Sequence, residues 1–178
     1  MIREFSVSPT PQNGNAKKYM ALSFFLAALI IAVSMMLKEY RGIVAVFSLV
    51  PLTLALLIYT KYLAPKYYYD VFINDDGVPL FIVRQVTGQR STTLCRVELS
   101  LITSVERENK AERRARKAES DVSRFIYCPT LFPESVIRIK LVGYGQKSEV
   151  VIEGNDEFLK TLDEYVNEAR KTIGESDE

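Results

Sequence analysis

Uncharged and mostly apolar residues form two runs near the start of the chain, at residues 19–37 and 43–60, and five residues separate the runs. Each run approaches the roughly 20 residues that a helix needs to cross a hydrocarbon layer about 30 Å thick. The pattern predicts a transmembrane hairpin of two helices within residues 18–63, preceded by a tail at residues 1–17. A soluble hairpin would need a larger surrounding core, and a signal peptide would not be followed at once by a second apolar run.

Tyrosines stand at the ends of both runs, where rings with a polar hydroxyl favour the surface of a bilayer. The predicted interface anchors are Tyr19, Tyr40, Tyr59 and Tyr62. Inside the second run, Pro51 predicts a kink and leaves the carbonyl of Phe47 without its usual helical donor. Ala28 and Ala32 form a pair of small residues at a spacing that would let the two helices approach closely.

Basic residues flank the hairpin mainly on the side of the two termini. Those outside the two apolar runs are Arg3, Lys17, Lys18, Lys61 and Lys66, with Arg84 and Arg90 further on, and those in the loop are Lys38 and Arg41, offset by Glu39. The positive-inside rule then predicts a cell-membrane protein with two spans and both termini in the cytoplasm. Cys95 and Cys128 form no C-x-x-C motif, which is typical of reduced cytosolic thiols.

After the hairpin the pattern changes from continuous apolar to alternating. Tyr67, Tyr69, Val71 and Ile73 share one face of a strand, and an Asn-Asp-Asp-Gly turn follows them. Alternation and turn residues together predict seven antiparallel strands. Their ranges are 67–74, 80–87, 90–97, 100–106, 124–128, 135–142 and 148–153.

The last predicted element is an amphipathic helix. Asn155 is the expected N-cap, Asp156 and Glu157 suit the first turn, and Gly174 ends the helix. Its apolar stripe is Phe158, Leu159, Leu162, Tyr165, Val166, Ala169 and Ile173. Such a stripe must be buried, and the open end of a small bent sheet is the available place. Residues 175–178 form an acidic tail.

This order of elements resembles the pleckstrin-homology (PH) fold. Over residues 18–173 the chain resembles bacterial membrane proteins with two transmembrane helices followed by a PH-like domain, including at residues 86–90 and 127–131. The resemblance implies a membrane α-helical hairpin plus an α+β domain at residues 64–174. In that domain a seven-stranded antiparallel PH-like β-barrel or sandwich is capped by the C-terminal helix.

The resemblance implies no site, because members of this group are mostly of unknown function. Phosphoinositide-binding PH domains use a basic cluster in the first hairpin turn, whereas residues 74–77 here are acidic. This departure argues against phosphoinositide binding at the usual place.

Composition narrows the chemistry further. The chain has no histidine, which excludes acid–base catalysis by imidazole, nucleophilic Ser-His and Cys-His pairs, and histidine metal ligands. Neither apolar run contains an ionisable residue, which argues against ion-coupled transport. We therefore expect no catalytic residue, no metal site and no cofactor.

A basic segment interrupts the domain at about residues 107–123, between the fourth and fifth predicted strands. Its candidate contact residues are Arg107, Lys110, Arg113, Arg114, Arg116 and Lys117. The segment is expected to be a solvated excursion between two strands, either disordered or helical, or else a contact for anionic lipid head groups or an acidic partner surface. A nucleic-acid partner is disfavoured because no aromatic residues are interleaved with the basic ones.

The sequence favours a non-enzymatic, membrane-anchored interaction module at the cytoplasmic face of the membrane. The module would bind a protein partner, or a second copy of itself, through a sheet edge or the groove beside the C-terminal helix. Two alternatives stay open. One is an anionic-lipid-binding or lipid-sensing domain that uses residues 107–117, and the other is an accessory subunit of a membrane enzyme or transporter.

Overall fold

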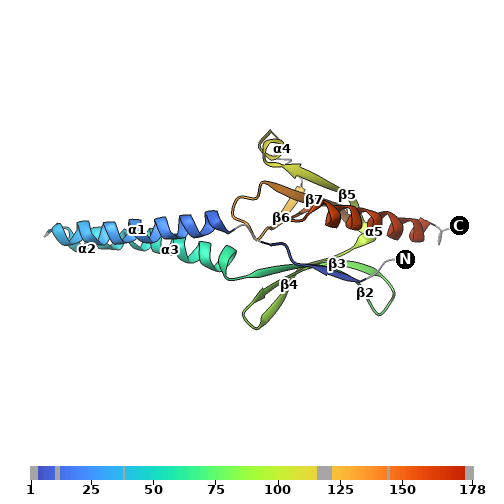
Figure 1. Ribbon diagram of the computed structural model, residues 1–178, viewed down its shortest axis with the longest axis horizontal. Coiled ribbons are helices and arrows are strands. Elements are labelled where there is room, and N and C mark those ends of the chain that lie inside the picture. Colours follow the sequence, from blue (N-terminus) through green and yellow to red (C-terminus); the bar gives the residue numbers. More distant parts are fainter. Residues whose placement is uncertain (1–3, 11–12, 38, 116–121, 144, 175–178) are drawn as a thin grey trace. The chain divides into compact units, whose positions relative to one another are not determined.

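The computed structural model describes residues 4–10, 13–37, 39–115, 122–143 and 145–174, with side chains up to residue 171. The chain forms two compact units, drawn in Figure 1. The helical unit comprises Pro11–Pro65 and Pro129–Phe132. The β-domain comprises Met1–Thr10, Lys66–Cys128 and Pro133–Glu178.

The helical unit contains two helical stretches of 23 residues each, and both are long and apolar enough to cross a membrane. The first is α1 (Gly14–Met36). The second, Arg41–Leu63, consists of α2 (Arg41–Val46), α3 (Leu49–Ile58) and the π-helical turn η1 (Tyr59–Leu63). The two long apolar helices predicted from the sequence are thereby confirmed.

Mostly small residues line the buried faces of these helices, and most of their large apolar side chains are exposed. The buried residues are Ala16, Ser23, Ala27 and Ser34 on α1, and Ser48, Pro51, Ala55 and Ile58 on the second stretch. The expectation for Ala28 and Ala32 is wrong, because both are exposed. Neighbouring helical positions differ by about 100° around the axis, so the packed face passes through Ala27 instead.

The second helical stretch is irregular one turn before Pro51. Phe47 and Ser48 lie between α2 and α3, and their N–H groups bond to the carbonyls of Val44 and Ala45, each at 3.1 Å. The carbonyl of Phe47, which Pro51 cannot serve, accepts the N–H of Val50 at 3.3 Å. The proline therefore costs no unpaired carbonyl, which is the condition for tolerating it in an apolar environment.

The β-domain contains two four-stranded sheets. The first has the order β1-β2-β3-β4 and is antiparallel throughout, with strands β1 (Phe5–Val7), β2 (Lys66–Ile73), β3 (Pro79–Thr87) and β4 (Arg90–Glu98). The second has the order β5-β7-β8-β6, with strands β5 (Ile102–Asn109), β6 (Val122–Tyr127), β7 (Ser135–Gly143) and β8 (Gln146–Ile152). A single 3₁₀ turn, η2 (Leu99–Leu101), leads from the first sheet into the second.

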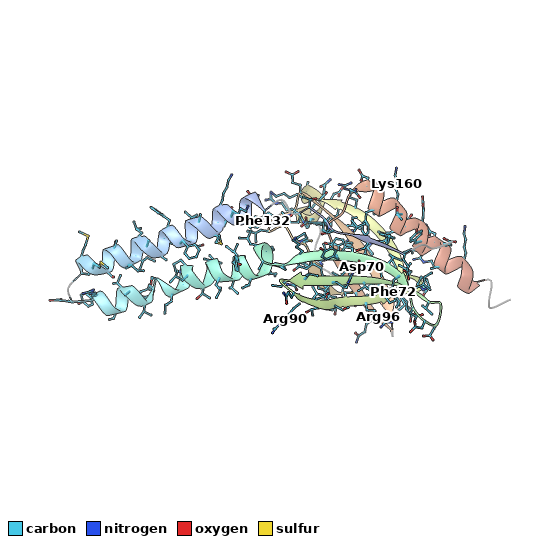
Figure 2. All side chains as sticks on the ribbon, turned by 60° about the horizontal axis from the view of Figure 1, so that its bottom comes forward. Asp70, Phe72, Arg90, Arg96, Phe132 and Lys160 are labelled. Atoms are coloured by element: carbon cyan, nitrogen blue, oxygen red, sulfur yellow. The ribbon has the colours of Figure 1, made fainter. Side chains whose placement is uncertain are left out.

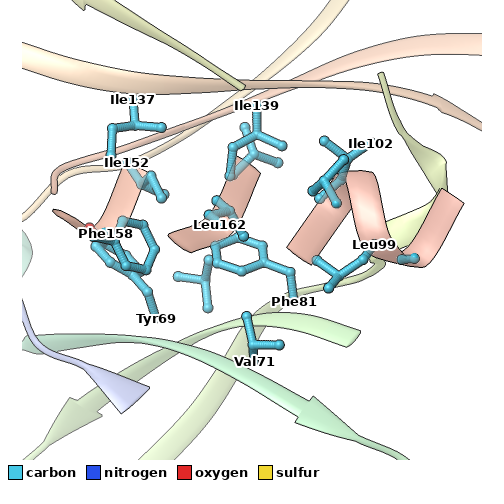
Figure 3. Close-up of a cluster of buried hydrophobic side chains, with 14 of the residues drawn as sticks. Tyr69, Val71, Phe81, Leu99, Ile102, Ile137, Ile139, Ile152, Phe158 and Leu162 are labelled. Carbon is cyan, nitrogen blue, oxygen red and sulfur yellow. The ribbon is translucent and has the colours of Figure 1, made fainter. Parts of the chain in front are cut away.

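Helix α5 (Asp156–Gly174) begins at the predicted cap, where Asn155 Oδ1 accepts the N–H of Phe158 at 2.8 Å. Four members of its apolar stripe, Phe158, Leu162, Val166 and Ala169, are buried in one core with residues of both sheets, and Figure 3 shows Phe158 and Leu162 there. The fully buried members of this core include Tyr69, Val71, Phe81, Ile137, Ile139, Ile152 and Leu162. The helix thus supplies apolar surface that two small sheets alone would leave exposed.

The expected α+β domain is confirmed, but the expected seven-stranded antiparallel barrel or sandwich differs from the structure in three respects. There are eight described strands, because residues 5–7 pair with Val71–Tyr69 of β2. Strand β6 runs parallel to β8. The described strands form two separate hydrogen-bonded sheets and no closed barrel.

The parallel strand explains the basic segment structurally. Residues 110–121 lead from β5 to β6, which point in the same direction at opposite edges of the second sheet. A connection between two strands that run in the same direction needs about a dozen residues or more and commonly includes a helix. Helix α4 (Lys110–Ala115) forms the first part of it, starting at Asn109, whose Oδ1 accepts the N–H groups of Ala111 and Glu112.

Candidate interaction sites

The groove between β2 and α5 is filled by the chain's own N-terminal strand. Phe5 packs its ring 5.8 Å from Phe158 and 5.6 Å from Tyr165 of α5, centroid to centroid. Just after β1, the Ser8 hydroxyl donates to the carbonyl of Tyr67 at 3.0 Å. A partner was expected to bind either at a sheet edge or in the groove beside the C-terminal helix. On the side of α5 that faces β2, β1 already occupies this groove.

Strand β6 is an edge strand with exposed apolar side chains. It pairs with β8 on one side and ends the second sheet. The side chains of Phe125 and Ile126 point to opposite faces and are 46% and 61% exposed. Arg124 is the only charged residue of the strand, and its Nε lies 3.0 Å from Oε2 of the buried Glu149. No free charge therefore protects this edge from pairing.

The other described edges are less apolar or shorter. Strand β5 carries Glu106 and Arg107 and is followed by α4, whereas β1 has three residues. Strand β4 exposes Arg90, Ser91, Thr92 and Thr93 at its start. Among the described strands, β6 is thus the edge best suited to adding another strand.

A charged ladder covers the outer face of the second sheet beside β6. Glu106 accepts bonds from Arg138 at 3.0 Å and from Lys140 at 2.8 Å. Arg138 also lies 3.6 Å from Oε1 of Glu149. Because these charges are paired within the sheet, this face offers little net charge to a ligand.

The basic segment is only partly free to bind. Arg107 pairs with Asp156 and donates to Ser135 Oγ at 3.0 Å. Arg113 donates to the carbonyl of Pro133 at 2.6 Å. The remaining described members, Lys110 and Arg114, are exposed on α4, and the predicted contact residues Arg116 and Lys117 lie outside the described residues. The described part does not form one continuous basic patch.

The predicted interface tyrosines all belong to the helical unit. Tyr19 lies in the second turn of α1, Tyr40 directly precedes α2, and Tyr59 and Tyr62 lie in η1. Tyr19, Tyr40 and Tyr59 are exposed, and the Lys61 ammonium lies 5.6 Å from the centroid of the Tyr62 ring. Their places at the helix ends suit interface anchors, which stays a prediction.

Asp70 is a buried carboxylate on the outer face of the first sheet, labelled with Phe72 in Figure 2. One oxygen pairs with Arg84, whose guanidinium lies 6.0 Å from the centroid of the Tyr68 ring. The other oxygen accepts no hydrogen bond from the described residues. The side chains of Asp70 and Arg84 border a cavity of about 490 Å³. Asp70 is therefore placed to accept a hydrogen bond from a small cationic or amide group in that cavity.

The two thiols belong to the packing of the β-domain. Burial raises the pKa of Cys95 to about 11. Burial, and next the charge of Glu153, raise the pKa of Cys128 to about 12, against the opposing effect of Arg113. Neither thiol is a ready nucleophile at neutral pH. In the part of the chain that the structure describes, no three Cys, Asp or Glu side chains are grouped to hold a metal ion.

Sequence reasoning missed β1 and the Asp70 carboxylate. A polar residue between apolar ones is the normal pattern of a half-exposed strand, so nothing local marks Asp70 as buried. Comparison with protein-family models, with curated proteins and with solved structures finds no match for this chain.

Proposed function

We propose that this chain is a two-span protein of the cell membrane whose β-domain binds an extended segment of a protein partner along β6. Both termini lie in the cytoplasm, and the β-domain is a non-enzymatic, PH-like module. The single observation that carries the binding proposal is the open β6 edge with Phe125 and Ile126 exposed.

The membrane part of the proposal rests on the two helical stretches. Their large apolar side chains, such as Phe25, Leu57 and Val50, are exposed while small residues are packed inside. In water this arrangement would be unfavourable by about 25 cal/mol for each Å² of exposed apolar surface. In a bilayer it is the expected one, because packing between small residues holds membrane helices together.

The PH-like part rests on the sandwich and its helix. Two four-stranded sheets with a C-terminal helix in their shared core support it. The additional strand β1 and the parallel strand β6 are departures from a simple antiparallel arrangement. The proposed binding site is therefore an edge strand of this domain and is not carried over from the ligand site of another PH domain.

Strand addition suits β6 for energetic reasons. An added strand would satisfy main-chain N–H and C=O groups along the open edge, and Phe125 and Ile126 would lose apolar surface to the partner's side chains. The charge that most often guards an edge is lysine or arginine. Here Arg124 is held by Glu149, so the partner meets an apolar and locally neutral strand.

Affinity purification of the tagged full chain from native membranes tests the proposal. We expect a partner with the wild type and with Val142→Ser, which removes an exposed valine from β7, and loss of that partner with the double variant Phe125→Ser/Ile126→Ser. Equal recovery with the double variant would contradict binding at β6.

The anionic-lipid alternative has weaker support. Among the described residues of the basic segment, Lys110 and Arg114 are exposed and have no hydrogen bond or ion pair to another part of the β-domain, whereas Arg107 and Arg113 do. Two exposed charges supply about 1 kcal/mol each near an anionic leaflet, which is little for a separate binding function.

A further inference from the structure

The short loop Pro129–Phe132 belongs to the helical unit, although β6 and β7 flank it in the sequence. The ring of Phe132 packs edge-on against that of Tyr19, with 5.7 Å between their centroids. Leu131 and Phe132 also border a cavity of about 340 Å³ together with Leu22, Leu26, Leu54 and Ile58. The loop therefore shares its apolar surroundings with both helical stretches.

Position along α1 gives the depth of this contact. Tyr19 is the first residue of the uncharged run and follows Lys17 and Lys18. A tyrosine directly after two lysines marks the boundary between head groups and acyl chains. Leu22 and Leu26 lie one and two turns further into the span. Phe132, which contacts Tyr19 and borders the same cavity as these leucines, thus lies at the boundary or just below it.

The loop is chemically suited to that depth. No charged residue occurs from Cys128 to Pro133, and the two prolines have no N–H that would need a partner away from water. Phe132 is 52% exposed, and Figure 2 labels it beside the start of α1. Since Phe132 contacts Tyr19 of α1, its exposed ring adds to the apolar surface that the two helical stretches already expose.

A basic group stands at the end of the loop. Arg113 donates to the carbonyl of Pro133, the residue that directly follows Phe132.

We infer that Leu131 and Phe132 are a third membrane-inserted element, which enters the lipid beside α1 to about 5–10 Å, as interfacial apolar groups do. The occupant of the exposed face of Phe132 is the acyl chain region of the bilayer. This inference rests on the proposed membrane insertion of the two helical stretches, and it adds a contact made by residues that the sequence places within the soluble domain.

The absence of tryptophan from the chain permits a direct test, because each introduced tryptophan is the only one. Four single variants of the full chain are reconstituted in polymer-bounded lipid nanodiscs, which contain no tryptophan of their own. Phe132→Trp reports on the loop, Phe25→Trp on the middle of α1, and Phe125→Trp on an aromatic position of similar exposure in the β-domain. Leu131→Trp is a second reporter on the loop. Quenching by lipids brominated in their acyl chains is compared with quenching by aqueous iodide.

We expect the tryptophans at positions 25, 131 and 132 to be quenched by brominated lipid and protected from iodide, with positions 131 and 132 quenched more by shallow bromines. Position 125 should show the reverse. If position 25 is quenched by lipid while positions 131 and 132 respond only to iodide, the loop inference is overturned and the two spans stand. If position 25 also responds only to iodide, the membrane insertion of the helices fails as well.

Discussion

The buried hydroxyl of Tyr69 donates a hydrogen bond of 2.8 Å to the main-chain carbonyl of Tyr127. The same hydroxyl accepts the N–H of Glu153 at 3.3 Å, so one side chain of β2 serves two main-chain groups that belong with the second sheet. The Tyr127 hydroxyl in turn donates to the carbonyl of Leu94 at 3.2 Å. These bonds hold the end of β6, and with it the proposed binding edge, to the first sheet.

Tyr69→Phe should therefore destabilise the β-domain. The substitution keeps the ring but leaves a buried carbonyl and N–H without this partner, at a cost of about 1–3 kcal/mol in the free energy of unfolding. Urea unfolding of the full chain in detergent, followed by circular dichroism, measures the loss. Tyr68→Phe is the matched control on the half-exposed face of the same strand and should change stability by less than about 0.5 kcal/mol. Equal losses in the two variants would contradict the role of the hydroxyl.

Stability should fall at alkaline pH. Burial raises the pKa of Tyr69 above its ordinary value and raises the pKa of Cys128 to about 12, so the folded chain keeps protons that the unfolded chain releases. When a group has a higher pKa in the folded state, its protonation stabilises the fold. This stabilisation is fully present below the pKa of the unfolded state, about 9 for a thiol, and is lost as the pH rises through the pKa of the folded state. The urea midpoint should thus be level at neutral pH and decline above about pH 9. Cys128→Ala should reduce the slope at the start of this decline, and an unchanged slope would count against a buried, protonated thiol.

Gly154→Ala should be costly because the space for a methyl group is taken. A Cβ at this position would lie 2.7 Å from Ile137 Cδ1 and 2.8 Å from Phe158 Cδ1, both in the core. Overpacking of this kind costs about 1–3 kcal/mol. Gly143→Ala is the control, since its Cβ would meet Leu101 Cδ1 at an ordinary 3.9 Å. Thermal unfolding should separate the two variants, and a Gly154→Ala protein as stable as Gly143→Ala would show that the core yields easily.

Glu149→Ala should loosen β6 more than Glu106→Ala does. Glu149 is buried and faces both Arg124 and Arg138, so its removal leaves a nearly buried guanidinium with fewer partners. Breaking a buried pair in this way costs about 3 kcal/mol or more, whereas the half-exposed Glu106 should contribute about 1 kcal/mol or less. Amide hydrogen exchange of residues 122–127 measures the local effect. Faster exchange in both variants alike would contradict the special position of Glu149.

The sequence predicted the elements whose pattern is long and periodic. Both apolar helices and α5 with its Asn155 cap are confirmed, because length, periodicity and capping are local properties of the chain. The hairpin of β7 and β8 is also where alternation and the Gly-rich turn predicted it.

The rest depends on pairing, which local pattern does not encode. Strand β1 has three residues, too few for a visible alternation, and it forms only because β2 and α5 offer a groove for Phe5. The parallel direction of β6 could not be predicted, because the sequence of the basic segment before it is equally compatible with a solvated excursion between antiparallel strands. Phe125 is exposed because β6 lies at the edge of the second sheet, and the contact of Phe132 with Tyr19 likewise joins residues far apart in the sequence.

Site-specific photo-crosslinking in intact cells tests the central claim most directly. A benzophenone amino acid is placed at Phe125 or Ile126 of β6, and at Thr92, an exposed position of β4, as the control. We expect positions 125 and 126 to crosslink to one and the same protein, and position 92 not to crosslink to it. Crosslinks at all three positions alike, or at none of them, would contradict a module that binds its partner along β6.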